Sequence, residues 1–167
     1  MLLVSAALAA LLIQSCAETA EFGPNDANKK FFDSWMKVNY PGIEKDGLGI
    51  YIIDDQTGTG RSIGSVEDYP YAYVTFTVRD LDGNITETTD IKTAQQVGTY
   101  DEGTYYGPKT IFRNPAYLSA GVEDMLGTMK IGGTRTAVIP GWLDTKKRYD
   151  SEEGYLKNET GEDYIYT

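Results

Sequence analysis

The side chains that could do chemistry in this chain are restricted by the absence of histidine. The 167 residues include no histidine and one cysteine, Cys16. Without an imidazole, the chain cannot assemble a Ser-His-Asp or Cys-His catalytic group or a histidine-bearing metal site. The other candidates are carboxylates and a large aromatic set that includes 13 tyrosines. We therefore expect chemistry that needs no titrating imidazole, no metal and no cofactor.

Residues 121–140 have the pattern of a short helix, a tight turn and a strand. Apolar residues recur at helical spacing and predict one apolar helix face: Leu118, Val122, Met125, Leu126 and Met129. Gly132-Gly133 is expected to break this helix and to let the backbone reverse. Residues 134–139 favour a strand, and Pro140 ends its pairing because proline has no N–H to donate.

Two earlier blocks extend this pattern. The sequence GLGIYII at 47–53 predicts a strand, followed by a Gly-x-Gly turn at Gly58-Thr59-Gly60. The sequence VTFTVRDLDGNITETTD at 74–90 predicts a hairpin with Asp82-Gly83 at its turn. In their order and approximate spacing, the three blocks resemble the FKBP-type peptidyl-prolyl cis-trans isomerases, in their bacterial lipoprotein form, over most of residues 46–140. The resemblance implies an α+β fold, with an antiparallel twisted sheet of about five strands wrapped on one short helix.

The expected elements follow from these blocks. Strands are predicted at 48–53, 72–79, 85–93 and 134–139, 105–112 is a strand or a loop, and the only helix of the domain lies near 116–129. An extra N-terminal helix begins at a cap, Asn25 or Asp26, runs to about Val38 and ends at Pro41-Gly42. Its apolar side carries Phe31, Phe32, Trp35 and Met36. This helix either packs against the domain or binds a partner or a second copy.

The N-terminal residues MLLVSAALAALLIQSC are apolar and uncharged. The run is shorter than the about 20 residues of a membrane-spanning helix and fits the apolar region of a secretory signal. Ile13-Gln14-Ser15-Cys16 resembles the lipobox of bacterial lipoproteins, which implies cleavage before Cys16 and its lipidation. A plain signal peptide with an incidental cysteine is the alternative. We expect a signal peptide at 1–15, a tether and helix at 16–45, and an FKBP-like domain at 46–167 whose last strand is truncated.

The FKBP resemblance also implies which residues line an apolar pocket. Phe76 stands seven residues before the hairpin Gly83 and matches a wall aromatic. Val122 matches the pocket floor, and the N–H of Ser119 would hold the substrate carbonyl beside Leu118. The other matched positions are the carboxylate Glu87, the substitute wall Trp142 and the final-strand residue Tyr166.

The same residues also have structural interpretations. Val122 is smaller than the tryptophan usual in the family, and Thr86 replaces a family aromatic. Phe76, Val122 and Leu118 could instead be core residues, Trp142 a rim residue and Glu87 a solvated carboxylate. The tyrosines also admit two interpretations, a sticky surface for peptide or glycan, or strand residues with one polar end in water: Tyr69, Tyr71, Tyr73, Tyr100, Tyr105 and Tyr106.

Prolyl isomerisation, the reaction that the resemblance implies, demands little acid–base chemistry. The barrier to rotation, about 18–20 kcal/mol, comes from amide resonance. The twisted amide is less polar than the planar one, so a dry apolar pocket favours the transition state. The expected partners are proline-containing polypeptides folding in a Gram-negative cell envelope, with the protein anchored to the outer membrane through Cys16.

The charge of the chain excludes one class of partner. A net charge of −10 repels nucleic-acid phosphates, so we expect no nucleic-acid partner. Two rivals to the isomerase remain, a non-catalytic FKBP-like module that holds unfolded chains and a structural lipoprotein with the same fold.

Overall fold

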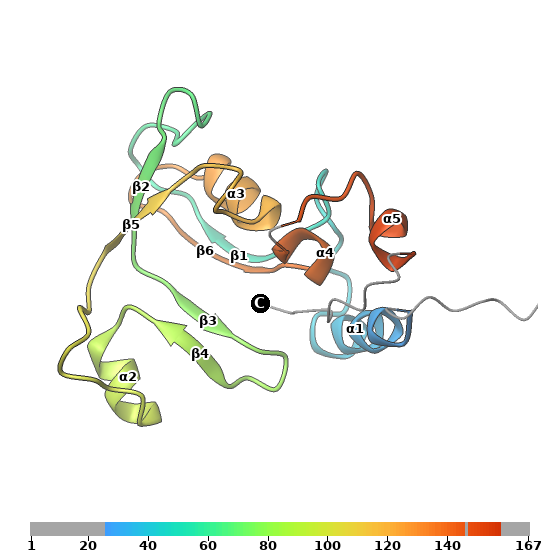
Figure 1. The fold of residues 1–167 in the computed structure, drawn as a ribbon, viewed down its shortest axis with the longest axis horizontal. Coiled ribbons are helices and arrows are strands. Elements are labelled where there is room, and N and C mark those ends of the chain that lie inside the picture. The colour runs from blue at the N-terminus through green and yellow to red at the C-terminus, as the bar shows by residue number, and fades with distance from the viewer. Residues whose placement is uncertain (1–25, 146, 158–167) are drawn as a thin grey trace, which may run out of the picture.

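The computed structural model describes residues 26–145 and 147–157. These residues form a mixed α+β structure in which every strand pairing is antiparallel (Figure 1). The elements in chain order are α1 (Asp26–Asn39), β1 (Tyr51–Gln56), β2 (Tyr71–Val74), β3 (Thr77–Arg79), β4 (Ile85–Thr88), α2 (Ile91–Val97), β5 (Lys109–Phe112), α3 (Ala120–Gly127), β6 (Thr134–Val138), α4 (Gly141–Asp144) and α5 (Glu152–Leu156).

The described residues do not show the single sheet of about five strands that the sequence predicts. Among these residues, the strands make three two-stranded sheets, β1–β6, β2–β5 and β3–β4. The expectation of one domain helix is also wrong, because α2, α4 and α5 accompany α3. In Figure 1, the β1–β6 pair lies centrally beside α3 and α4, while β3–β4 and α2 form a separate arm.

The β1–β6 pair joins two of the sequence blocks. Tyr51 lies opposite Val138, and a bulge interrupts the register between Ile52 and Asp54. The strand begins later than predicted because Asp46 holds the preceding turn. Its carboxylate accepts the backbone N–H groups of Leu48, Gly49 and Ile50 at 3.0, 2.7 and 3.0 Å. Pro140 follows the end of β6, as expected, and is the N-cap residue of the short helix α4.

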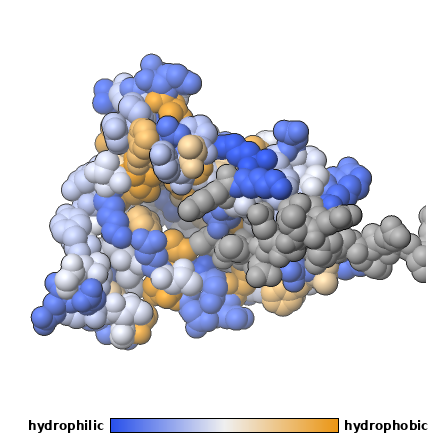
Figure 2. Space-filling model, viewed as in Figure 1, coloured by the Kyte–Doolittle hydropathy of each residue, from blue (hydrophilic) through white to orange (hydrophobic). Residues whose placement is uncertain are grey.

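The predicted strand 72–79 is divided because it changes partners. Residues 71–74 pair with β5, and residues 77–79 pair with β4. Between them, the backbone of Phe76 is held by Thr89, whose N–H donates to the Phe76 carbonyl at 2.9 Å. Figure 2 shows hydrophobic surface at the upper left of the molecule, over the end where β2 and β5 lie. The Asp82-Gly83 turn is confirmed, with Gly83 at a φ of 86°.

The predicted strand 85–93 is wrong beyond Thr88. Asp90 caps a helix there, since its side chain accepts the N–H of Thr93 at 2.7 Å. Gly98, at a φ of 76°, ends this helix α2 in the left-handed region. The polar tail also contains an unexpected helix, α5, which Ser151 caps.

Helix α3 is shorter than predicted. Ser119 caps its start, and it ends at Gly127 rather than at Gly132-Gly133, which instead makes the turn into β6. Of the predicted apolar face, Leu126 is buried and Val122 and Met125 are half-buried. Both half-buried residues pack on a core cluster of Ile50, Ile139 and Leu143.

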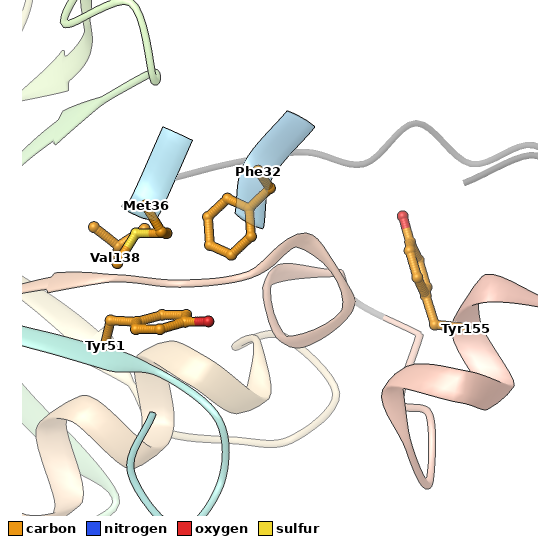
Figure 3. Close-up of a cluster of buried hydrophobic side chains, with 5 residues drawn as sticks. All are labelled: Phe32, Met36, Tyr51, Val138 and Tyr155. Atoms are coloured by element: carbon orange, nitrogen blue, oxygen red, sulfur yellow. The ribbon is translucent and has the colours of Figure 1, made fainter. Parts of the chain in front are cut away.

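A larger core cluster brings both ends of the described chain together. Phe32 and Met36 of α1 point toward Tyr51 of β1 and Val138 of β6, and Tyr155 of α5 joins them (Figure 3). The Phe32 and Tyr51 rings meet edge to face with centroids 5.8 Å apart. The interpretation of α1 as an amphipathic helix packed on the domain is therefore confirmed.

Arg113 ties the β2–β5 pair to α3. Its side chain is fully buried and donates twice to the Glu123 carboxylate, at 3.1 and 2.6 Å. The same guanidinium donates to the carbonyls of Gly64 and Tyr69 at 2.8 and 3.0 Å. The backbone N–H of Arg113 donates to the Pro70 carbonyl at 2.8 Å. A buried charge is tolerated here because its donors are paired.

The Gly58 turn packs against the turn before β6 at backbone contact. A Cβ atom on Gly58 would overlap the backbone of Ile131 and Gly133. We predict that Gly58→Ala lowers the free energy of unfolding by about 2–3 kcal/mol, because backbone cannot move aside as a side chain can. Urea unfolding measures this loss. Gly47→Ala is the control, since a Cβ there meets nothing within 4 Å, and equal losses in both variants would contradict the steric explanation.

Candidate functional site

Phe76 lies at the break between β2 and β3, half-buried. Its N–H donates to the Thr89 hydroxyl oxygen at 2.9 Å, and that hydroxyl donates to the Phe76 carbonyl at 3.2 Å. Thr89 is itself buried. The backbone that carries the Phe76 ring is therefore fixed by contacts on the β4 side of the hairpin.

Glu87 and Lys109 lie beside Phe76. The Lys109 ammonium stands 2.9 Å from a Glu87 carboxylate oxygen and 5.6 Å from the centroid of the Phe76 ring. The structure therefore brings two predicted site residues together through a lysine that sequence analysis missed. The β2–β5 register, which pairs Val74 with Lys109, explains this placement. Both charged side chains are substantially exposed, so their ion pair adds little stability.

A second group of predicted residues lies at α3 and α4. The buried Ser119 hydroxyl accepts the N–H of Val122 at 3.3 Å and caps α3. Leu118 is half-buried, and its carbonyl accepts from the Arg148 guanidinium at 3.3 Å. Ser119 thus serves as a helix cap in addition to any role of its backbone N–H.

Trp142 and Val122 pack into the core between sheet and helices. Val122 packs against the cluster of Ile50, Ile139 and Leu143, and Trp142 contacts both core clusters. The Trp142 ring also faces Gly49, where an added Cβ would lie 3.2 Å from Cζ2. Its Nε1 is buried and has no hydrogen-bond partner among the described residues. Leaving such a donor unpaired costs about 1–3 kcal/mol.

The contacts of the predicted site residues fall into two groups. The hydrogen bonds and ring contacts described above connect Phe76 with Glu87, and Ser119 with Val122, but they do not connect these two pairs. Tyr166 and Cys16 lie outside the described residues. A shallow hollow of about 270 Å³ between α1 and β1 is lined by Met36, Tyr40, Ile43 and Tyr51, none of them a predicted site residue.

An acidic pair links α3 to the turn before β1. The carboxyl group of Asp124 hydrogen-bonds to that of Asp46. Burial, this hydrogen bond and the charges of Asp46 and Glu123 raise the pKa of Asp124 to about 6, against a smaller opposing effect of Arg135. Burial alone would raise the pKa of Asp46, but hydrogen bonds from the Gly49 N–H, Asp124 and further backbone N–H groups lower it. Below about pH 6 the pair therefore holds one proton, with Asp124 as its donor.

Comparisons with known proteins leave the chain without an assigned family. No protein-family model matches it, and no curated protein matches it. Within the described residues, no cluster of three or more acidic or cysteine side chains could hold a metal ion. No helix in that part of the chain is long and apolar enough to cross a membrane.

The Asp46–Asp124 pair makes stability depend on pH. Because the folded-state pKa of Asp124 lies above its ordinary value of 3.8, its stabilising contribution is present at acidic pH and is lost as the pH rises through about 6. We predict that Asp124→Asn, which keeps a donor toward Asp46, raises the free energy of unfolding by about 1 kcal/mol at pH 7.5 after allowance for solvent screening.

Urea unfolding at pH 4.5 and 7.5 measures this effect. The gain should be clearly smaller at pH 4.5, which lies between the ordinary value of 3.8 and the folded-state pKa of about 6. Asp82→Asn, a surface change at the hairpin turn, serves as the control. A difference between wild type and Asp124→Asn that is the same at both pH values would rule out the shared proton.

Proposed function

We propose that this protein is an FKBP-type peptidyl-prolyl cis-trans isomerase that acts on X-Pro bonds of exported proteins. The proposal includes secretion, lipidation of Cys16 and an outer-membrane anchor in a Gram-negative envelope. It also includes the finer fold, one FKBP-like sheet of about five strands wrapped on α3.

One observation carries the proposal: two of the blocks of sequence that resemble the FKBP family lie far apart in the chain but contact each other in the structure. The strand of the first block, β1, pairs with the strand of the last block, β6. The Gly58-Thr59-Gly60 turn that follows β1 packs on the turn before β6, where the Gly60 N–H donates to the Ile131 carbonyl at 2.9 Å. A Cβ on Gly60 would lie 2.7 Å from the Cβ of Ile131. The glycines of the resemblance thus have a physical reason, which supports the family assignment.

The proposed mechanism is desolvation of the amide. Phe76 forms an apolar wall against which the proline ring packs, and the Ser119 N–H holds the carbonyl that precedes the proline. Val122, Leu118, Trp142 and Tyr166 exclude water from the twisting bond. Because the twisted amide is less polar than the planar amide, water exclusion lowers the barrier to rotation. No side chain has to exchange a proton.

The alternative function is a non-catalytic module that holds unfolded chains. Two observations favour it. An ammonium group, that of Lys109, stands over the Phe76 ring, where the mechanism needs an apolar surface. Trp142 is packed against Gly49 and both core clusters, rather than standing free to cover a substrate.

The first test is catalysis. We predict that the full chain in detergent accelerates the isomerisation of a proline-containing tetrapeptide, and that Phe76→Ala lowers kcat/KM by at least about tenfold, because the wall of the pocket is removed. Phe31→Ala, which removes an exposed phenylalanine from α1, is the matched control. A folded wild-type protein without catalysis would reject the isomerase and leave the binding module.

A second test addresses the charge over the ring. We predict that Lys109→Met raises kcat/KM about threefold, since an apolar side chain replaces an ammonium group that attracts water to the proposed pocket. Lys147→Met is the matched control, because Lys147 also lies over an aromatic ring, that of Tyr149, at 4.9 Å. An unchanged or lower rate in Lys109→Met would place Phe76 outside the reacting region.

A further inference from the structure

The β2–β5 pair exposes a continuous row of aromatic side chains. Tyr71 and Tyr73 alternate with the buried Ala72 along β2, so both project from one face. Tyr71 lies opposite Phe112 of β5, and the two rings stack with centroids 5.1 Å apart. Phe112 in turn contacts Tyr117 at 6.0 Å. At the other end, the hydroxyl of Tyr105 hydrogen-bonds to that of Tyr73.

We name these five residues the aromatic row, and all of them are open to solvent. The exposed fractions are 61% for Tyr71, 68% for Tyr73, 62% for Tyr105, 41% for Phe112 and 72% for Tyr117. Isolated exposed apolar residues are ordinary, but a contiguous patch of this kind marks an interaction surface. Tyrosine in particular is enriched in such surfaces because it offers a large rigid ring and a hydrogen-bonding group.

The electrostatics of the row favour a cationic partner. The chain carries 25 acidic and 15 basic residues, so its field attracts positive charge. Aromatic faces bind ammonium and guanidinium groups. Among the described residues, the protein's own cations lie over Tyr51, Tyr69, Phe76 and Tyr149, not over the row. Its five rings therefore remain available to cations from another molecule.

The strand geometry favours a polypeptide over a glycan. The β2–β5 sheet has two strands, so within the described part of the chain each strand has one edge without a neighbour. Such an edge offers backbone N–H and C=O groups that an extended polypeptide can pair. Phe76 follows β2 by two residues, so the row lies next to it along the chain.

We propose that the aromatic row binds extended polypeptide segments in which lysine or arginine alternates with apolar residues. The row would bind a client chain beside the proposed Phe76 pocket, so this inference rests on the proposed function. The binding itself requires no catalysis. The row contacts the basic and apolar side chains of the client. This contact does not depend on which peptide bond of the client lies in the proposed pocket.

Fluorescence anisotropy with the full chain in detergent tests the proposal. The probe is a fluorescein-labelled, proline-free peptide in which lysine alternates with valine or phenylalanine. We expect binding that weakens as salt concentration rises, and binding at least about tenfold weaker when every lysine of the peptide is glutamate. The double variant Tyr73→Ser/Tyr117→Ser should weaken binding about tenfold, since it removes two exposed rings.

The controls separate the row from the rest of the surface. Tyr100→Ser removes an exposed tyrosine that stacks on Tyr106, outside the row, and should leave affinity unchanged. Circular dichroism checks that each variant is folded, and the single variants replace the double variant if it unfolds. Tyr73→Phe, which keeps the ring, should retain binding.

Three results would each overturn the proposal. The protein could bind the lysine and glutamate peptides with equal affinity, or the row variants could bind the peptide as tightly as wild type. The row could also bind chitohexaose while the protein does not bind the peptide. Self-association that the row variants abolish, with no peptide binding, would show that a second copy covers the row. If the protein does not catalyse tetrapeptide isomerisation but still binds the peptide through the row, only the catalytic function is rejected. Catalysis without such binding rejects only the row.

Discussion

The paired, fully buried charge of Arg113 is the constraint on which the arrangement of this protein depends. Its guanidinium joins a carboxylate on α3 to two carbonyls in the loop between β1 and β2. Its own backbone continues β5, so a single residue fixes the β2–β5 pair relative to the helix. Without Arg113, Glu123 and both carbonyls would lose their donors, and without Glu123 a buried charge would be unpaired. Removing one partner of a buried ion pair typically lowers the free energy of unfolding by about 3–5 kcal/mol.

The sequence was most informative where the determinants of structure are local. The amphipathic pattern of α1, the Asp82-Gly83 turn and the proline that follows β6 act within a few residues, and each was predicted correctly. The helix α2 was missed although Asp90 and Gly98 mark its ends, because the β-branched residues before it were extended as one strand. The division of strand 72–79 could not be predicted, since it depends on which distant strand supplies the hydrogen bonds.

The candidate site shows the same limit. Phe76 and Glu87 lie on one hairpin, so their proximity follows from a local turn. Lys109 reaches them only through the pairing of β5 with β2, which no short pattern in the sequence encodes. Trp142 and Val122 were expected to line a pocket, but their contacts are with core residues brought together by β1, α3 and α4. Whether an apolar side chain is buried in a core or lines a pocket depends on long-range packing. The residue type is the same in both cases, so the sequence pattern does not distinguish them.

The core in Figure 3 has a consequence for the order in which the chain can fold. It is assembled from α1 and β1 near one end and from β6 and α5 near the other. A chain that emerges from a ribosome N-terminus first releases Phe32 and Tyr51 long before Val138 and Tyr155. Until Val138 and Tyr155 emerge, Phe32 and Tyr51 have only each other and their N-terminal neighbours to pack against. The core in Figure 3 can therefore close only late in synthesis, after most of the described chain has emerged.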